Sequence, residues 1–269
     1  MRTELLVIDP QVDFCDPNGA LFVNGAVEDM QRLEKFVDAF AKKLDGISVT
    51  LDSHHFNDVA HPSFWRSGSD GKNPDPFTII THQDIVDGVW TTTIPSLCNR
   101  MKDYTEALEA GGRYPLCIWP PHCLIGSMGH QVVPSLFESL KTWEADRFKI
   151  VNYVTKGSNI FTEHYSAVQA EVPDPEDPST QLNTSLINQL LQVDVLYVAG
   201  EAGSHCLANT VRDIANAFND ESAISKIHLL KDATSPVPGF ESNQEDFIKE
   251  MEARGMVVEE IDNLLTLTV

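Results

Sequence analysis

Three side chains of the sequence have the types that nucleophilic catalysis needs, and each lies where an apolar run ends. Asp9 ends the run ELLVID, Lys156 ends FKIVNYVTK, and Cys206 follows VDVLYVAG at the start of a helical pattern. A thiol at a helix N-terminus meets unpaired amide groups, which favour the thiolate and can hold an oxyanion. An ammonium would stabilise that thiolate, and a carboxylate could carry a proton to a leaving amine. The sequence therefore predicts that Lys156 and the helix lower the pKa of Cys206.

Each of these residues also has a purely structural interpretation. A buried cysteine is common where a strand meets a helix, a carboxylate can cap a turn, and a lysine at a strand end often extends into solvent. Position alone leaves these alternatives open. A thiol, a carboxylate and an ammonium at the ends of strands of one parallel sheet favour a shared pocket.

A second group of residues has the spacing of a metal site. Asp52 and His54 alternate across one residue at the end of the run ISVTLD, so both side chains can point the same way. With a third imidazole they would form an Asp-His-His set that suits Zn, Mn or Fe and leaves coordination positions open. The candidates for the third ligand are His55, His61 and His122. A lone Asp-x-His pair is weak evidence, because a histidine is more often a surface or core residue than a ligand.

These residues need a parallel sheet to bring them together, and the hydrophobic pattern predicts one. The predicted strands are 4–9, 47–52, 148–156, 193–200, 226–233 and 256–261. The predicted helices are 27–44, 97–108, 134–143, 184–192, 206–219 and 242–254, the last with a capping box of Ser242 and Glu245. Alternating strands and helices predict an α/β fold with helices on both faces and ligands at the carboxyl ends of the strands.

Domain organisation follows from length and composition. The 269 residues predict a single domain over 1–269, with an insertion at about 66–115 that is rich in Pro, Gly, Asp and Thr. No glycine-rich phosphate loop follows a predicted strand, which weighs against a nucleotide-binding fold.

The charge and the cysteines exclude several classes of protein. A formal net charge of −21 argues against nucleic acid and anionic membranes as partners. No apolar run is long enough for a transmembrane helix, and the N-terminus is too short and acidic for a signal peptide. The cysteines form an odd set without framework spacing, which predicts free thiols and a cytoplasmic location: Cys15, Cys98, Cys117, Cys123 and Cys206.

Taken in order, the motifs resemble those of the isochorismatase-like cysteine hydrolases, and most closely the nicotinamidase/pyrazinamidase branch. The similar segments are VIDPQVDF, LDSHHFNDVAHPSF, WPPHCLIGSMG, the KG at 156–157 and VAGEAGSHC. Each motif alone is modest, but all of them in one order are specific for the superfamily. The resemblance covers nearly the whole chain apart from about 66–115. It implies a six-stranded parallel sheet in the order 3-2-1-4-5-6 and a homo-oligomer.

The resemblance implies a role for each catalytic position. Cys206 would be the nucleophile, Asp9 the general acid and base, and Lys156 the third member of the triad. The amides of Ala202 and Cys206 would hold the oxyanion, next to a cis peptide bond between Glu201 and Ala202.

It also implies the ligands of a divalent metal, most simply Zn, with Mn or Fe as alternatives. Asp52, His54 and His122 would bind the ion, with His61 near it or on it. Phe14 and Trp119 would sandwich a planar ring.

The resemblance finally implies a metal-containing amidase that hydrolyses nicotinamide or a similar small aromatic carboxamide. Two departures stand out: Glu201 where many relatives have an aliphatic residue, and Ser204 where many have Asp. The long insertion could cover the pocket and change which amide fits. The rival interpretations are a hydrolase of N-carbamoyl or ureide amides, and a non-catalytic binding protein on the same scaffold.

Overall fold

The central element is a parallel sheet whose inner strands are largely buried, while its two edge strands are more exposed. The computed structural model describes residues 1–218 and 220–266, so residue 219 of the helix predicted over 206–219 and residues 267–269 of the predicted domain lie outside the described residues. The six-stranded sheet has the order β10-β9-β8-β1-β2-β7. Its strands are β1 (Thr3–Ile8), β2 (Gly46–Asp52), β7 (Asn152–Lys156), β8 (Val195–Gly200), β9 (Ile227–Leu230) and β10 (Val257–Glu259). Counted along the chain, this is the predicted order 3-2-1-4-5-6, and all neighbours are parallel.

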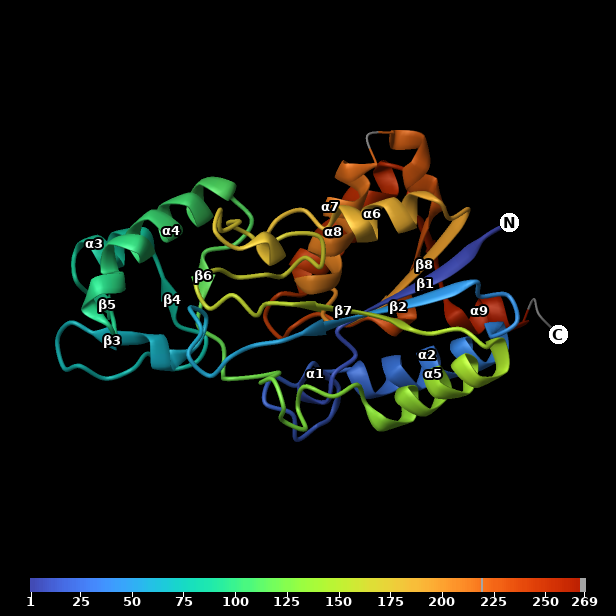
Figure 1. Cartoon of the computed structure of the whole chain (residues 1–269), viewed down its shortest axis with the longest axis horizontal. Helices are drawn as coiled ribbons and strands as arrows, with labels where there is room; N and C mark the ends of the chain where they lie inside the picture. Colours follow the sequence, from blue (N-terminus) through green and yellow to red (C-terminus); the bar gives the residue numbers. More distant parts are fainter. Residues whose placement is uncertain (219, 267–269) are drawn as a thin grey trace.

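Helices cover both faces of this sheet. Figure 1 shows α2 (Ala26–Phe40) and α5 (Pro134–Arg147) on one side, and α6 (Thr184–Leu191), α7 (Cys206–Ala217) and α8 (Glu241–Ala253) on the other. Two short helices complete the layers, α1 (Val12–Cys15) and α9 (Ile261–Thr266). The predicted α/β architecture with helices on both faces is therefore confirmed. Among the described residues, no helix is both long and apolar enough to span a bilayer.

Several predicted boundaries were wrong, and three of them concern the ends of long elements. The capping box of Ser242 and Glu245 does not form, because α8 begins at Glu241, which puts Ser242 inside its first turn. The predicted strand over 148–156 begins only at Asn152, because Phe148 ends α5 in the left-handed region with φ 51°. The helix predicted to reach Leu44 ends at Phe40, although Leu44 is still buried in the core.

The insertion has a small hydrophobic core of its own. The predicted helix is present as α4 (Cys98–Gly111), and α3 (His82–Val86) precedes it. Two antiparallel strand pairs were not predicted: β3 (Trp65–Ser67) with β5 (Trp90–Thr92), and β4 (Ile79–Ile80) with β6 (Leu116–Cys117). A buried cluster separate from the main core joins them, formed by Val59, Phe64, Trp65, Ile80, Ile85, Met101, Tyr104, Leu108, Leu116 and Ile118.

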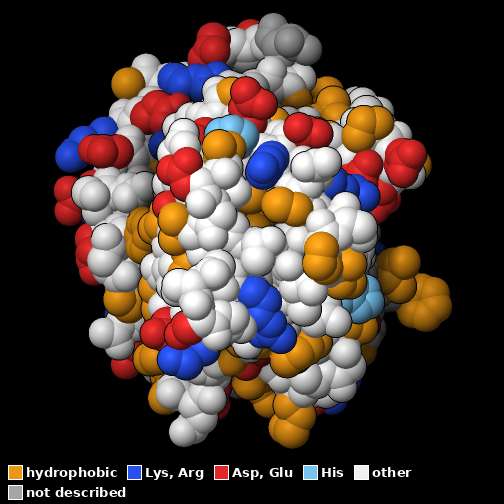
Figure 2. Space-filling view, turned by 90° about the vertical axis from the view of Figure 1, so that its left-hand side faces the viewer, with side chains coloured by type: hydrophobic (Ala, Val, Ile, Leu, Met, Phe, Trp, Pro, Cys, Tyr) orange, Lys and Arg blue, Asp and Glu red, His pale blue; other side chains and the backbone are white. Residues whose placement is uncertain are grey.

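This insertion projects beyond the carboxyl ends of the strands at one end of the molecule (Figure 1). Figure 2 shows that end, where apolar side chains lie scattered among polar and charged ones. The exposed large apolar residues of the insertion are Phe77, Ile79, Val86, Val89 and Ile94. The insertion therefore lies on the side of the molecule where the strands that carry the predicted site residues end.

Candidate active site

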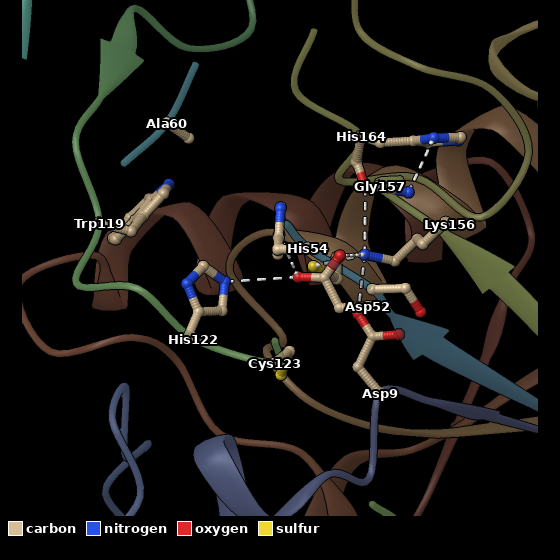
Figure 3. A network of polar contacts seen from close by, with 12 residues as sticks. Asp9, Asp52, His54, Ala60, Trp119, His122, Cys123, Lys156, Gly157 and His164 are labelled. Atoms are coloured by element: carbon tan, nitrogen blue, oxygen red, sulfur yellow. Dashed lines mark hydrogen bonds and ion pairs between the residues drawn. The ribbon is translucent and has the colours of Figure 1, made fainter. Parts of the chain in front are cut away.

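The predicted nucleophile, acid and lysine meet at the carboxyl ends of three strands. The Nζ atom of Lys156 lies 3.5 Å from Sγ of Cys206 and 2.9 Å from Oδ2 of Asp9. Asp9 follows β1, Lys156 ends β7, and Cys206 begins the helix after β8. All three side chains are buried, so water does not separate the charges. Figure 3 shows the Lys156 amine directed between the carboxylates of Asp9 and Asp52.

The Asp9 carboxyl is held by its own strand and the next. Oδ1 of Asp9 accepts a hydrogen bond of 2.5 Å from the Thr50 hydroxyl, which in turn accepts from the Asp9 amide at 3.0 Å. The backbone of Asp9 lies in the left-handed region with φ 43°, a conformation that non-glycine residues rarely adopt outside functional sites. The neighbouring strand comes close because Gly200 has no side chain: a Cβ there would lie 2.1 Å from the Ile8 carbonyl.

Burial decides the protonation of this triad. Burial alone would lower the pKa of Lys156, but the Asp52 and Asp9 carboxylates raise that pKa well above its ordinary value. Burial raises the pKa of Asp9, and Lys156 only partly offsets the effect. Burial also raises the pKa of Cys206 well above its ordinary value, although Lys156 acts in the opposite direction. The predicted lowering of the Cys206 pKa was therefore wrong, because the sequence argument counted the ammonium and the helix but not the burial.

The three predicted metal ligands converge. Their ligating atoms all lie within 4.8 Å of one another. Oδ2 of Asp52 is 3.0 Å from Nε2 of His54 and 3.4 Å from Nε2 of His122. In Figure 3, His54 and His122 both lie beside the Asp52 carboxylate, on the side away from Lys156.

The outer contacts of both histidines leave a nitrogen free for a metal. Nδ1 of His54 lies 3.1 Å from Oδ2 of Asp58, and Nδ1 of His122 lies 2.9 Å from the Pro120 carbonyl. Because both partners are acceptors, each Nδ1 can donate its proton to them, which leaves each Nε2, beside Asp52, as the nitrogen that a metal would bind. Two imidazole nitrogens and one carboxylate oxygen are a donor set for a divalent transition metal. The residues present therefore fit such an ion.

His61 lies beside this cluster but outside the converging set. Its ring centroid is 5.1 Å from that of His54 and 5.5 Å from that of His122. Its Nδ1 faces the Phe56 carbonyl at 3.3 Å, and its buried Nε2 has no partner among the described residues. Burial, with the neighbouring imidazoles, lowers the pKa of His61 to about 4, so the ring is neutral.

The turn predicted to hold an oxyanion lies at the same pocket. The peptide bond between Glu201 and Ala202 is cis, as the motif resemblance implied. Among the described residues, the Ala202 amide has no hydrogen-bond acceptor, while the Ala202 carbonyl accepts from His205 and Leu207. The Cys206 amide is the first of α7, where amides lack an acceptor within the helix.

Comparisons with known proteins agree with this geometry at the level of the fold. No protein-family model matches the sequence, and no curated protein matches it. Solved structures do match. The yeast nicotinamidase bound to the inhibitor nicotinaldehyde has a TM-score of 0.65 and 20% identity, over 96% of this chain and 99% of its own. The chain has the nicotinamidase fold.

Two further structures support that assignment. The Acinetobacter baumanii nicotinamidase pyrazinamidase has a TM-score of 0.63 and 19% identity, over 98% of both chains. The Pyrococcus horikoshii pyrazinamidase, solved in complex with zinc, has a TM-score of 0.58 and 19% identity, over 97% of this chain and 99% of its own. Because the matches extend over nearly the whole of each chain, the insertion lies within the nicotinamidase fold.

Within this nicotinamidase fold, an aromatic pocket opens beside Cys206. Phe14 and Trp119, predicted as the ring-binding pair, both line it. Nε1 of Trp119 is 3.2 Å from Oε2 of Glu163 and 3.2 Å from the Tyr165 hydroxyl, which fixes the indole plane. The whole lining is Phe14, Leu21, Asp52, His54, Trp119, His122, Glu163, His164, Tyr165, Ala202, His205, Cys206 and Val237.

Several residues of this site were not predicted. Glu163 and Tyr165 come from the irregular segment after β7, and burial raises the pKa of Glu163 to about 7. Asp58 orients His54 through Nδ1 of that ring. In the sequence, only its position four residues after His54 could have indicated this contact. The Gln11 side chain donates to the Asp52 carbonyl and accepts from the Asp52 amide, both at 2.7 Å. Gln11 lies in the VIDPQVDF motif, but no role was predicted for it from the sequence.

Proposed function

We propose that the chain is a metal-containing cysteine amidohydrolase that releases ammonia from a small aromatic carboxamide, most simply nicotinamide. One observation carries the proposal: a buried ammonium contacts both a carboxyl and the Cys206 thiol, and that thiol lines an aromatic pocket together with an Asp-His-His set. The thiol, acid and cation serve nucleophilic acyl transfer. The aromatic lining serves a flat ring.

The first half of the reaction forms a thioester. Asp9 accepts the proton of the Cys206 thiol as Sγ attacks the carboxamide carbon, and the carbonyl electrons move onto the oxygen. The amides of Ala202 and Cys206 receive that oxyanion. Asp9 then gives the proton to the amide nitrogen, the C–N bond breaks, and ammonia leaves. Lys156 stays charged throughout and offsets the negative charge that moves between sulfur and Asp9.

The second half hydrolyses the thioester with the same groups. Water attacks the thioester carbon while Asp9 takes one of its protons. The C–S bond then breaks, the carboxylic acid leaves, and Asp9 returns the proton to the sulfur of Cys206. The raised pKa of Asp9 suits this double role, because an acid that must accept and return a proton works best near the working pH.

Asp52, His54 and His122 would hold the metal ion, most simply Zn²⁺, with Mn²⁺ or Fe²⁺ as alternatives. Such an ion supplies a Lewis acid with open positions for a ring nitrogen or a water molecule. The protein's own contribution is to orient the two imidazoles through Asp58 and the Pro120 carbonyl. It also orients the Asp52 carboxylate, whose Oδ1 accepts a hydrogen bond of 3.0 Å from Nζ of Lys156.

The experiment is ammonia release from nicotinamide, pyrazinamide, N-carbamoyl amino acids and ureides, with metal analysis of protein purified without chelators. We expect turnover of the aromatic carboxamides and one divalent ion per chain. Cys206→Ala should lower turnover by about 10⁴-fold or more, because the nucleophile is lost. Cys98→Ala, at a half-buried position on the insertion, should change nothing. Ammonia release that survives Cys206→Ala would remove the assigned nucleophile, and turnover of ureides alone would favour the rival substrate class.

A further inference from the structure

A buried pair of carboxyl groups lies behind the turn that carries Ala202. Glu201 is 0% exposed and Asp29, in the first turn of α2, is 4% exposed. Both carboxyl groups bond to Ser235, and among the described residues no donor reaches the buried Oε1 of Glu201. A proton on Glu201, directed at the neighbouring Asp29 carboxylate, would satisfy that oxygen. Burial, together with the charge of Asp29, raises the pKa of Glu201 well above its ordinary value. Asp29 accepts from the Ser235 hydroxyl and pairs with Arg32, whereas Oε1 of Glu201 has no donor, so we assign the proton to Glu201.

Ser235 connects this pair to both sides of Ala202. Its amide donates to Oε2 of Glu201 at 3.1 Å, and its carbonyl accepts from the Gly203 amide at 2.9 Å. Its hydroxyl donates to Oδ2 of Asp29 at 2.5 Å. Because Ala202 lies between Glu201 and Gly203, one serine holds the residues on both sides of the oxyanion-binding amide.

The fit around Ser235 is close. Gly25, which precedes α2, lies against its hydroxyl, and a Cβ at that position would lie 2.4 Å from Oγ of Ser235. Gly25 also has a φ of 102°, which glycine adopts without strain. The chain thus brings α2 and the segment around 235 together behind the turn.

The charged and titratable groups around the pair supply little compensation. Nη1 of Arg32 lies 3.4 Å from Oδ1 of Asp29, with the arginine side chain 35% exposed. The Cys15 thiol of α1 faces both carboxyl groups, which help burial to raise its pKa. Glu28 is exposed and adds a further negative charge near Asp29. Among the described residues, no lysine or arginine pairs with Glu201, so the Ser235 amide and the proton compensate its buried carboxyl.

We propose that Glu201, as a neutral acid bridging Asp29 and Ser235, is a positioning residue that fixes the Ala202 amide for oxyanion binding, and that loss of its proton loosens the turn at alkaline pH. The inference rests on the proposed function, in which the Ala202 amide receives the oxyanion. When Glu201 is ionised, two carboxylates face each other without water, and their repulsion acts on the residue next to Ala202. The turnover number therefore depends on the ionisation of Glu201, although Glu201 does not contact the substrate.

Two substitutions at Glu201 separate the bridge from the proton. In Glu201→Gln the amide donates to Asp29 and accepts from Ser235 at every pH. We expect unchanged kcat at pH 7 and an alkaline fall in kcat that moves to higher pH. In Glu201→Leu both bonds are lost. We expect kcat to fall about tenfold or more with KM unchanged, because displacing one oxyanion donor affects only the transition state.

An aldehyde reports on the oxyanion site directly. Nicotinaldehyde would accept Sγ of Cys206 at its carbonyl carbon, the carbonyl electrons would become an alkoxide, and the thiol proton would pass to Asp9. Glu201→Leu should therefore raise the Ki of nicotinaldehyde by the same factor that lowers kcat. Asp29→Asn should move the alkaline fall in kcat to lower pH, since the charge opposing ionisation of Glu201 is gone. Glu28→Gln, which removes a neighbouring exposed charge, should match the wild type in every measurement.

A measurement without substrate tests the buried proton. A group whose pKa is raised on folding contributes its stability fully below its unfolded pKa, about 4.3 for Glu, and loses it as the pH rises through the folded pKa. The Tm of the wild type minus that of Glu201→Gln should therefore fall steadily from pH 5 to pH 9. A constant difference would overturn the proton bridge whether or not the protein is active.

The remaining outcomes separate the two proposals. Equal kcat and equal aldehyde Ki in the wild type and a folded Glu201→Leu would overturn the positioning role while the amidase proposal stands. A wild type that hydrolyses no amide and binds no aldehyde would overturn the amidase proposal and with it the oxyanion role. A Tm difference that still fell with pH would then support the proton bridge alone.

Discussion

Two buried clusters of carboxyl groups adjoin the oxyanion turn, and each is compensated in a different way. Asp9 and Asp52 share the Lys156 ammonium at 2.9 and 3.0 Å. Glu201 and Asp29 share a proton, with one arginine at the solvent-exposed rim. A fixed ammonium leaves Asp9 able to take a proton and return it. A shared proton fixes two side chains in place, but it is lost when the pH rises.

The comparison shows that buried carboxyl groups can serve proton transfer on one side of the oxyanion turn and backbone positioning on the other. Burying a carboxylate is costly unless a charge or a proton compensates it. Where catalysis moves a proton, the compensation is a permanent cation that does not itself react. Where the backbone must stay still, the compensation is the proton itself. The two clusters should therefore respond differently when their compensation is removed.

Removal of Lys156 should have the largest effect. Lys156→Met leaves Asp9 and Asp52 buried without their cation, which should lower the free energy of unfolding by about 3–5 kcal/mol. We also expect kcat/KM to fall by about 10³-fold, since sulfur loses the cation that offsets its charge. Urea unfolding and ammonia release measure the two effects.

Arg32→Met removes the cation of the Glu201 and Asp29 cluster and is the matched control for Lys156→Met. Arg32 is partly exposed and lies 3.4 Å from Asp29, so its loss should cost about 1 kcal/mol or less. Equal losses of stability in Lys156→Met and Arg32→Met would show that the two clusters are not compensated differently.

A smaller effect is expected at the metal ligands, where an imidazole joins two buried acids. His54 lies between Asp52 and Asp58, at 3.0 and 3.1 Å. Asp58→Ala frees the His54 ring to turn and should weaken metal affinity by about 10- to 100-fold. Competition with a chelating dye measures the affinity, and Asp70→Ala at the exposed surface is the control. Unchanged affinity in Asp58→Ala would mean that other contacts orient His54.

The last effect, confined to a window of pH, is expected at Glu171, whose compensation is intermediate between the two clusters. Its side chain is 4% exposed, Arg113 lies 3.7 Å away with its side chain 31% exposed, and burial raises the pKa of Glu171 to about 7. Its contribution to stability is complete below the unfolded pKa and is lost as the pH rises through about 7. The stability of the wild type relative to Glu171→Gln should fall by about 2–3 kcal/mol across that window. Urea unfolding at pH 4.5, 6 and 8 tests this, and a pH-independent difference would contradict it.

The strand order came from the resemblance of the motifs, whereas the strands and the strand ends that carry the triad could be predicted from patterns that are local in sequence. Apolar runs ending in Asp9, Asp52 and Lys156 locate the carboxyl ends of three strands, and parallel packing brings those ends together. Two of the boundary errors lie at helix ends, where the last turn and the cap depend on tertiary contacts. The two- and three-residue strands of the insertion are too short to produce a periodic pattern.

The groups that orient the site could not be predicted, since each depends on contacts across the chain. Glu201 stands out in the sequence only as a departure from the related motifs, and nothing there indicates Asp29, which is distant in the chain, as its partner. Glu163 reaches Trp119 from an irregular segment without hydrophobic periodicity. The pKa of Cys206 depends on how deeply the pocket is buried, which residue type and spacing do not reveal.

The central place of β1 also affects how the chain is synthesised. β1 pairs with β2 on one side and with β8 on the other, and β8 follows it by about 190 residues. At about 5–20 residues per second, the ribosome needs about 10–40 s to make that interval. During this time the nascent chain carries an apolar strand with one uncovered edge, which can pair with other chains. Slow codons in the insertion would lengthen this exposure, whereas the same codons after β8 would not.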